Sequence, residues 1–172
     1  MGAALTPTKT SSRQGRLFPP GQPEWAPPRR PHTKTMQDQI PARDKIPHRP
    51  PIAMVDSILT KHLPNVEVSA IIREDNCFLN SEGLLDRACI PELVSQAAAA
   101  VNTCRSQGQC RSGMLALGRG IKVFSDIRVN DEIIISGKDE HPMDNWYVVD
   151  FTIRRGIAGD ICAEGEVSIC VF

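Results

Sequence analysis

Hydrophobic and polar residues alternate along most of the chain beyond residue 51, which is the pattern of strands that bury one face. Two such stretches come first, residues 52–59 and 65–72, with a turn at 61–64 between them. Short segments rich in glycine, asparagine, aspartate or proline separate the later stretches and predict turns. The later stretches are residues 114–124, 132–137, 146–154 and 161–172.

One segment breaks this alternation and has the features of a helix. Pro91 suits the first helical turn, where its missing N–H costs nothing, and Glu92 places a negative charge near the positive end of the helix dipole. No proline or glycine occurs between Leu93 and Gln107, and Gly108 can end the helix. Two strands, one long Ala-rich helix and four strands predict an α+β fold in which an antiparallel sheet curves around the helix.

The N-terminal segment has a different composition. Residues 1–35 hold six basic residues, one acidic residue and seven of the 14 prolines. Proline removes backbone donors, so we expect a basic, Pro-rich disordered tail over residues 1–40 and one folded domain over residues 41–172. An organelle-targeting peptide is an alternative, although prolines oppose the amphipathic helix of such peptides. A natural start at Met36, without the tail, is another.

Composition excludes several classes of protein. The 172 residues carry 20 basic and 20 acidic side chains, whereas a protein that coats nucleic acid needs an excess of positive charge. No apolar run approaches the ~18–20 residues that cross a membrane. None of the six cysteines forms a Cys-x-x-Cys pair, so we expect no metal site and reduced thiols. The lack of a secretory h-region favours the cytoplasm.

Two short segments hold the residues that could carry chemistry. Residues 46–51 read Ile-Pro-His-Arg-Pro-Pro, and residues 90–98 read Ile-Pro-Glu-Leu-Val-Ser-Gln-Ala-Ala. His48 could serve only to anchor a proline-rich loop, and Glu92 could be only a favourable first-turn acid, worth up to ~1 kcal/mol. Gln96 lies one turn beyond Glu92 on the same helix face, where it can hydrogen-bond the carboxylate or the sheet.

These segments resemble β-hydroxyacyl-[acyl carrier protein] dehydratases. The family opens with Pro-His-Arg-x-Pro before an apolar strand, as in residues 47–51 followed by Val55-Asp56. Residues 92–97 match its Glu-x-x-x-Gln-Ala signature, and Asn130-Asp131 lies where the family has a Gly-Asp turn. Ala163-Glu164-Gly165-Glu166 resembles its closing strand. The resemblance implies the hot-dog fold, a curved antiparallel sheet wrapped around one central helix.

The resemblance spans about residues 45–172 and implies a reaction. A 3-hydroxyacyl thioester would lose water and become the trans-2-enoyl thioester, in the synthesis of fatty acids or related acyl chains. The acyl group would be attached as a thioester to the phosphopantetheine of an acyl carrier protein or CoA, with no other cofactor. The protein would form a homodimer or a higher even oligomer, with acyl tunnels between subunits.

The resemblance also implies a division of labour between two residues. In the family, a histidine moves protons and a helix carboxylate from the other subunit holds the leaving hydroxyl or water. Here these residues are His48 and Glu92. A base that titrates near neutral pH suits removal of the α-proton, and a carboxyl group at a helix start can be tuned to donate one.

One departure from the family concerns the histidine. The best-known members carry it in a Gly-His-Phe-Pro motif between the second strand and the helix, where this chain has Cys77 and Phe78 and no histidine. The sequence is most similar to a divergent branch, the dehydratases of aryl-polyene gene clusters, which also lacks that motif. We interpret the Cys77 side chain as a thiol packed in the protein interior and not as a nucleophile. The candidate substrate-binding residues are Gln96, Cys77, Phe78 and Arg119. The remaining histidines of the domain, His62 and His141, are expected in solvated turns.

Two other functions remain open at this stage. A hot-dog thioesterase would use Glu92 to activate water and would not need His48. An acyl-binding or heterodimer subunit without catalytic activity would account for the missing histidine motif. The three functions differ in their products, since a thioesterase releases a free thiol and a dehydratase leaves the thioester intact.

Overall fold

The computed structural model describes residues 39–60, 65–106, 113–139 and 146–172. The chain divides into two units, residues 1–34 and 35–172, and every described residue belongs to the second. Residues 1–38 of the predicted disordered tail, His62, His141 and the helix stop at Gly108 lie outside the described residues. The predicted tail ends too late by one residue, because Ile40 is in a strand and pairs with Ile58. No helix in the described ranges is long and apolar enough to cross a membrane.

The described part of the second unit forms one seven-stranded sheet in the order β1-β2-β3-β5-β6-β7-β4, with all neighbouring strands antiparallel. The six strands predicted from the alternation are all present. The additional strand is β1, whose two residues are too few to show alternation. The strands are β1 (Ile40–Pro41), β2 (Ser57–Thr60), β3 (Asn65–Ile71), β4 (Gly113–Val123), β5 (Glu132–Asp139), β6 (Trp146–Arg155) and β7 (Ile161–Val171).

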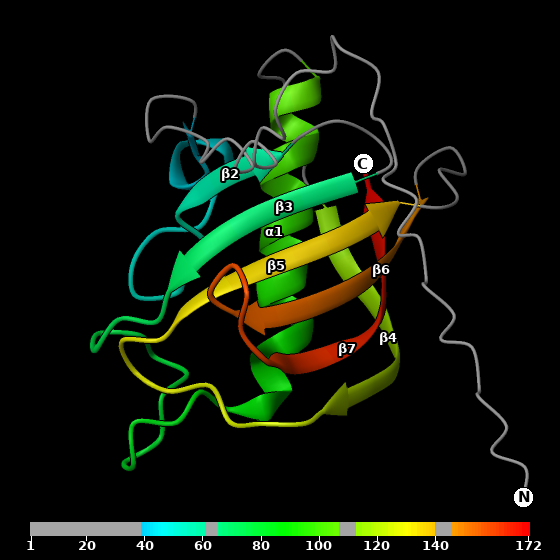
Figure 1. The fold of residues 1–172 in the computed structure, drawn as a ribbon. Coiled ribbons are helices and arrows are strands. Elements are labelled where there is room, and N and C mark those ends of the chain that lie inside the picture. Colours follow the sequence, from blue (N-terminus) through cyan, green and yellow to red (C-terminus); the bar gives the residue numbers. More distant parts are fainter. Residues whose placement is uncertain (1–38, 61–64, 107–112, 140–145) are drawn as a thin grey trace, which may run out of the picture. The chain divides into compact units, whose positions relative to one another are not determined.

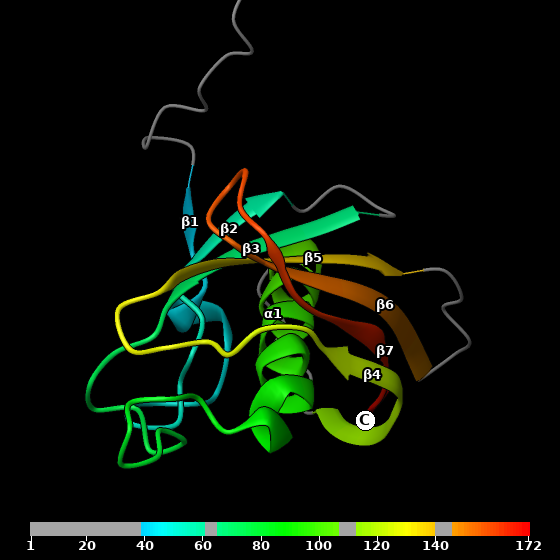
Figure 2. The ribbon, with the colours of Figure 1, turned by 60° about the horizontal axis from the view of Figure 1, so that its bottom comes forward.

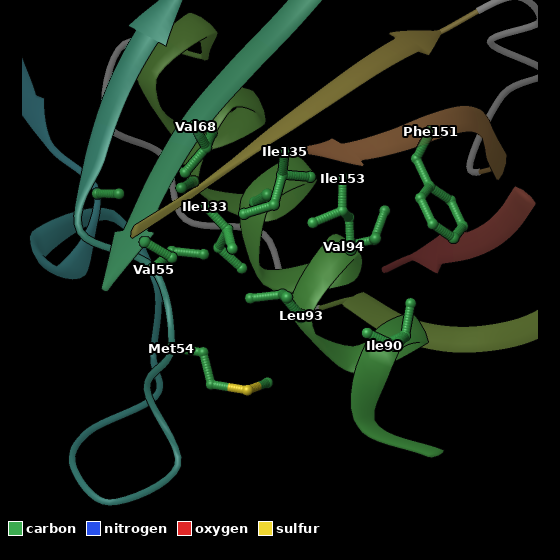
Figure 3. Close-up of a cluster of buried hydrophobic side chains, with 14 of the residues drawn as sticks. Met54, Val55, Val68, Ile90, Leu93, Val94, Ile133, Ile135, Phe151 and Ile153 are labelled. Atoms are coloured by element: carbon green, nitrogen blue, oxygen red, sulfur yellow. The ribbon is translucent and has the colours of Figure 1, made fainter. Parts of the chain in front are cut away.

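The helix α1 (Ile90–Arg105) lies against the concave face of this sheet, as Figures 1 and 2 show. Leu93 and Val94 point from α1 into the main core, where Ile133, Ile135 and Ile153 of the sheet meet them (Figure 3). All five of these side chains are buried. Burying such an aliphatic side chain contributes ~1.5–3 kcal/mol, so this layer holds helix and sheet together. The predicted α+β architecture is confirmed.

The prediction for the first strand is wrong at its start. The segment from Ile52 to Asp56 is not a strand, and β2 begins only at Ser57. Met54 and Val55 are nevertheless buried, which explains their apolar character. In a strand, the N–H of Met54 would donate to a carbonyl of a neighbouring strand. Here it donates to the side-chain oxygen of Gln96 at 2.9 Å. A periodicity of apolar residues cannot distinguish these two ways of being buried.

The turns before β5 and β7 form as predicted. Asn130 has a positive φ of 68°, which asparagine tolerates better than most residues, and Asp131 N–H donates to the carbonyl of Arg128 at 3.1 Å. Gly156 also has a positive φ, of 64°, and its N–H donates to the carbonyl of Glu132 at 2.7 Å. The turn at Gly156 joins β6 to β7, its neighbour in the sheet.

Strand β4 is an edge of the sheet, paired on one side with β7. It exposes apolar side chains: Met114 is 60% exposed and Leu117 is 49% exposed, and Phe124, directly after the strand, is 56% exposed. An edge strand presents unpaired backbone groups, and exposed apolar side chains along it mark a surface for association.

Candidate active site

Asp56 fixes the beginning of the loop that carries His48. Its carboxylate accepts a hydrogen bond from the N–H of Ile71 at 2.7 Å and pairs with Arg43 at 3.1 Å and Arg73 at 2.8 Å. Arg43 starts the 3-10 turn Arg43–Lys45, a few residues before His48. The loop is thereby tied to the end of β3.

Gln96 fixes the other end of the loop. Its side chain is almost fully buried, with 1% of the residue exposed. The oxygen accepts from Met54 N–H at 2.9 Å, and the nitrogen donates to the carbonyl of Ile52 at 3.1 Å and to Glu92 Oε1 at 3.0 Å. Both N–H bonds of the amide are used within the protein. The structure therefore shows Gln96 as a link between loop and helix, and its predicted role in substrate binding stays a prediction.

Replacing Gln96 with leucine is expected to lower the free energy of unfolding by about 3 kcal/mol, because buried backbone groups at Ile52 and Met54 lose their partners. Chemical denaturation of both proteins measures this difference. Asn102→Leu is the matched control, since its side-chain amide on the same helix makes no hydrogen bond to the described part of the chain. A loss below about 1 kcal/mol for Gln96→Leu would contradict the linking role.

His48 and Glu92 meet in one chain. His48 Nε2 lies 3.3 Å from Glu92 Oε1, the oxygen that also accepts from Gln96. Each side chain is about one-third exposed, so the pair lies at a surface that substrate can reach. The resemblance implied a carboxylate from the other subunit, whereas here the histidine and the carboxylate that it contacts belong to the same chain.

The local sequence explains this presentation. Pro47 disfavours helix at the residue before it, and Ile46 is extended, with φ −119° and ψ 153°. Pro91 lies at the start of α1, so Glu92 projects from the first turn of the helix. The helix spacing of four residues then places Gln96 on the same face as Glu92.

A cavity of about 100 Å³ opens beside the pair, between α1 and the sheet. His48, Glu92 and Gln96 line one part of it. Its sheet-side lining comes from β3, β4, β6 and β7 and is largely apolar, namely Val66, Leu115, Val149, Ile169 and Val171. An apolar cavity with a few convergent polar groups is typical of a small-molecule site. The tunnels between subunits that the resemblance implied stay a prediction.

The other three predicted substrate-binding residues do not line this cavity. Cys77 is exposed in the loop before α1, so its interpretation as a packed thiol is wrong. Phe78 packs against the core, and its N–H donates to the Asn76 side chain at 2.9 Å. Arg119 lies on β4 with 73% of its side chain exposed, 3.9 Å from Glu166. A role for these residues in binding stays a prediction.

The sequence analysis missed five polar residues that line the cavity: Ser95, Asn102, Thr103 and Arg105 on α1, and Tyr147 on β6. Ser95 and Asn102 are seven residues apart, two helical turns, with Ala98 and Ala99 between them on the same cavity wall. That spacing was a usable signal. Tyr147 gave none, because alternation assigns it to the inner face without indicating a cavity there.

The groups around the start of α1 exclude thiol chemistry at the pair. Burial raises the pKa of the Cys89 thiol to about 12, and the nearby Asp86 carboxylate adds to the effect. Cys89 directly precedes α1 and stays protonated near neutral pH, so it does not serve as a nucleophile beside Glu92. No group of three or more His, Cys, Asp or Glu side chains in the described ranges could hold a metal ion.

The ion pair between Arg87 and Asp126 lies near the same end of the helix, where Arg87 belongs to the turn that precedes α1. Arg87 Nη2 lies 2.8 Å from Asp126 Oδ1, and this hydrogen bond holds the pKa of Asp126 below the usual range. Asp126 therefore stays ionised at neutral pH. Its negative charge offsets the positive charge of Arg87 at this surface.

A single antiparallel sheet curved around one central helix, with a cavity between them beside the helix start, defines a hot-dog fold protein. The chain belongs to the ApeP-like family, whose model is described as ApeP dehydratase and matches residues 40–171. The family confirms the predicted enzyme class, a lyase that dehydrates 3-hydroxyacyl thioesters, and the divergent aryl-polyene branch. Among curated proteins, none matches the chain.

Solved structures are similar in fold at low sequence identity. The dehydratase heterocomplex ApeI:P from Xenorhabdus doucetiae has a TM-score of 0.69 at 16% identity, covering 77% of this chain and 91% of that chain. The protein smu.793 from Streptococcus mutans, bound to acetyl CoA, has a TM-score of 0.54 at 18% identity, covering 70% of this chain and 90% of that chain. Zebra fish thioesterase superfamily member 2 has a TM-score of 0.54 at 14% identity, covering 69% of this chain and 82% of that chain.

Proposed function

We propose that His48 and Glu92 are the catalytic pair of this dehydratase. The observation that carries the proposal is the 3.3 Å contact between His48 Nε2 and Glu92 Oε1 at the wall of the cavity. A histidine and a carboxyl group side by side supply a base and an acid for one reaction. The thiol of Cys89, directly before α1, is buried and protonated near neutral pH.

The protons balance over one turnover. Neutral His48 takes the α-proton next to the thioester carbonyl, and the electron pair left on that carbon forms the double bond as the β-hydroxyl leaves. Glu92, as the carboxylic acid, protonates the hydroxyl, which departs as water. The proton on His48 then passes to the Glu92 carboxylate across their contact, and both groups return to their starting forms.

The acyl group would lie in the cavity beside α1. The largely apolar wall formed by β3, β4, β6 and β7 suits an aliphatic chain. The thioester would be carried on phosphopantetheine, from an acyl carrier protein or CoA, with no further cofactor. A related fold, smu.793, binds acetyl CoA, which supports a thioester substrate of this kind. The reaction would serve the synthesis of fatty acids or related acyl chains in the cytoplasm.

The assembly would be a dimer joined through the edge of β4. Two copies related by a two-fold axis can pair this strand with itself and bury its exposed apolar side chains. The similar ApeI:P structure is a heterocomplex, so the partner could be a second copy or a different hot-dog chain. We propose the homodimer, because β4 exposes Met114 and Leu117 on a surface that can complement itself.

Replacing Leu117 with lysine is expected to convert the dimer to monomer at micromolar concentration, since like charges would face each other across the two-fold axis. Analytical ultracentrifugation measures the change. Ile157→Lys is the control, because Ile157 is 86% exposed and lies in the turn before β7. A Leu117→Lys variant that sediments like the parent protein would contradict pairing through β4.

A thioesterase is the second candidate, supported by the thioesterases among the similar structures and by a carboxylate at the cavity wall. In that reaction Glu92 would activate water for attack on the thioester carbonyl. His48 would then be dispensable.

The deciding experiment is a mass-spectrometric assay with 3-hydroxyacyl and trans-2-enoyl thioesters. Interconversion of the two by loss or gain of one water supports the proposal. Release of the free thiol would identify a thioesterase. Binding without conversion would identify an acyl-binding subunit, and activity only after addition of a second hot-dog chain would replace the homodimer with a heteromer.

A further inference from the structure

The ring of His48 has few contacts that could orient it. Its Nε2 faces Glu92 at 3.3 Å, while its Nδ1 is buried and has no hydrogen-bond partner. In most sites that use histidine, the second ring nitrogen is held by a carbonyl or a carboxylate. Within the described ranges nothing does this for His48. With a single polar contact on the ring, the position of the backbone becomes important for where the ring points.

Arg49 holds that backbone from both sides. Its Nη1 donates to the carbonyl of Ile46 at 2.8 Å and to the carbonyl of His48 at 2.8 Å. These two carbonyls belong to the peptide planes before Pro47 and after His48, and the ring of Pro47 fixes its φ. Few rotations remain free between the two planes. The clamp thus determines where the Cα–Cβ bond of His48 points.

The guanidinium of Arg49 has no other role in the described part of the chain. It forms no ion pair there, although Arg43, Arg73 and Arg87 all pair with aspartates. The residue is exposed, so its side chain does not contribute to the core. The main-chain carbonyl of Arg49 accepts from the N–H groups of Ile52 and Ala53, which continues the same turn toward Gln96.

We propose that Arg49 is a positioning residue for catalysis, which aligns His48 with Glu92 by clamping the carbonyls of Ile46 and His48. The inference rests on the proposed function, in which His48 moves protons. A displacement of about 1 Å at a reacting group can cost on the order of 100-fold in rate. Loss of the clamp should therefore slow the chemical step and leave substrate binding nearly unchanged.

The test compares Arg49→Gln, Arg49→Lys and the control Lys45→Gln, which removes one positive charge from the neighbouring turn. Dehydration is measured with a 3-hydroxyacyl-CoA and with the same acyl group on N-acetylcysteamine, which has no phosphate. We expect Arg49→Gln to lower kcat by about 10- to 100-fold on both substrates, with KM within about twofold. Arg49→Lys should restore part of kcat, and Lys45→Gln should retain full activity.

The outcomes separate this inference from the alternatives. A rise in KM on the CoA substrate alone would show that Arg49 binds the phosphate and would overturn the positioning role. An unchanged kcat in Arg49→Gln would also overturn it. If the wild type dehydrates neither substrate, the proposed function fails, and hydrogen exchange then decides the clamp. Faster exchange of the amides of Ile52 and Ala53 in Arg49→Gln supports the clamp, and unchanged exchange refutes it.

Discussion

Replacement of His48 with alanine is expected to lower kcat for dehydration by about 10²- to 10⁴-fold, because the α-proton loses its base. The fold should be little affected, since the only polar interaction of the His48 side chain in the described part of the chain is with Glu92 at 3.3 Å. Steady-state kinetics with a 3-hydroxyacyl thioester measure the first effect, and thermal unfolding measures the second.

Asp44→Ala is a suitable control for this variant, because Asp44 is exposed on the turn just before the His48 loop. It should match the wild type in kcat and in Tm. A His48→Ala protein that keeps more than about a tenth of kcat would mean that His48 only anchors the loop. The same variant separates the two enzymatic candidates, because a thioesterase that relies on Glu92 alone would retain its activity.

Replacement of Glu92 with glutamine should lower kcat by about 10²- to 10⁴-fold, because the amide cannot give a proton to the leaving hydroxyl. A second experiment mixes the two variants, His48→Ala and Glu92→Gln.

Since His48 and Glu92 meet within one chain, dimers that combine one subunit of each variant contain no complete pair. Unfolding and refolding the two variants together should therefore restore no activity.

A pair built from two subunits would give a different result. Half of the randomly formed dimers would contain one complete site, and activity would recover to about a quarter of the wild-type level. Refolded mixtures of wild type with either variant control for losses during refolding. Recovery near a quarter would contradict the arrangement within one chain, whereas activity at the level of the single variants would support it.

The fold was largely predictable because the chain alternates where its strands bury one face and has one long segment that suits a helix. The start of β2 was not, because Met54 and Val55 are buried without belonging to a strand. Their burial depends on a hydrogen bond from Met54 to Gln96, 42 residues away. Local periodicity contains no information about such a partner.

The candidate site was predictable in its members and less so in its arrangement. His48, Glu92 and Gln96 were found by residue type and spacing, and the structure brings them together. Their contact within one chain depends on how the loop folds back on α1, which one sequence does not reveal. Cys77 and Arg119 were placed by analogy of position along the chain, and the structure leaves both exposed outside the cavity.

A base and an acid that share one polypeptide change what a second subunit must preserve. When the two groups come from different chains, each site takes one group from each gene copy. A copy that loses both groups then disables both sites of a mixed dimer, so the copies are forced to evolve together. With both groups in one chain, a duplicated copy could lose both its histidine and its carboxylate and still assemble with an intact copy that remains active. Selection could then change the inactive copy so that it stabilises the dimer, binds the acyl carrier protein or regulates the active copy.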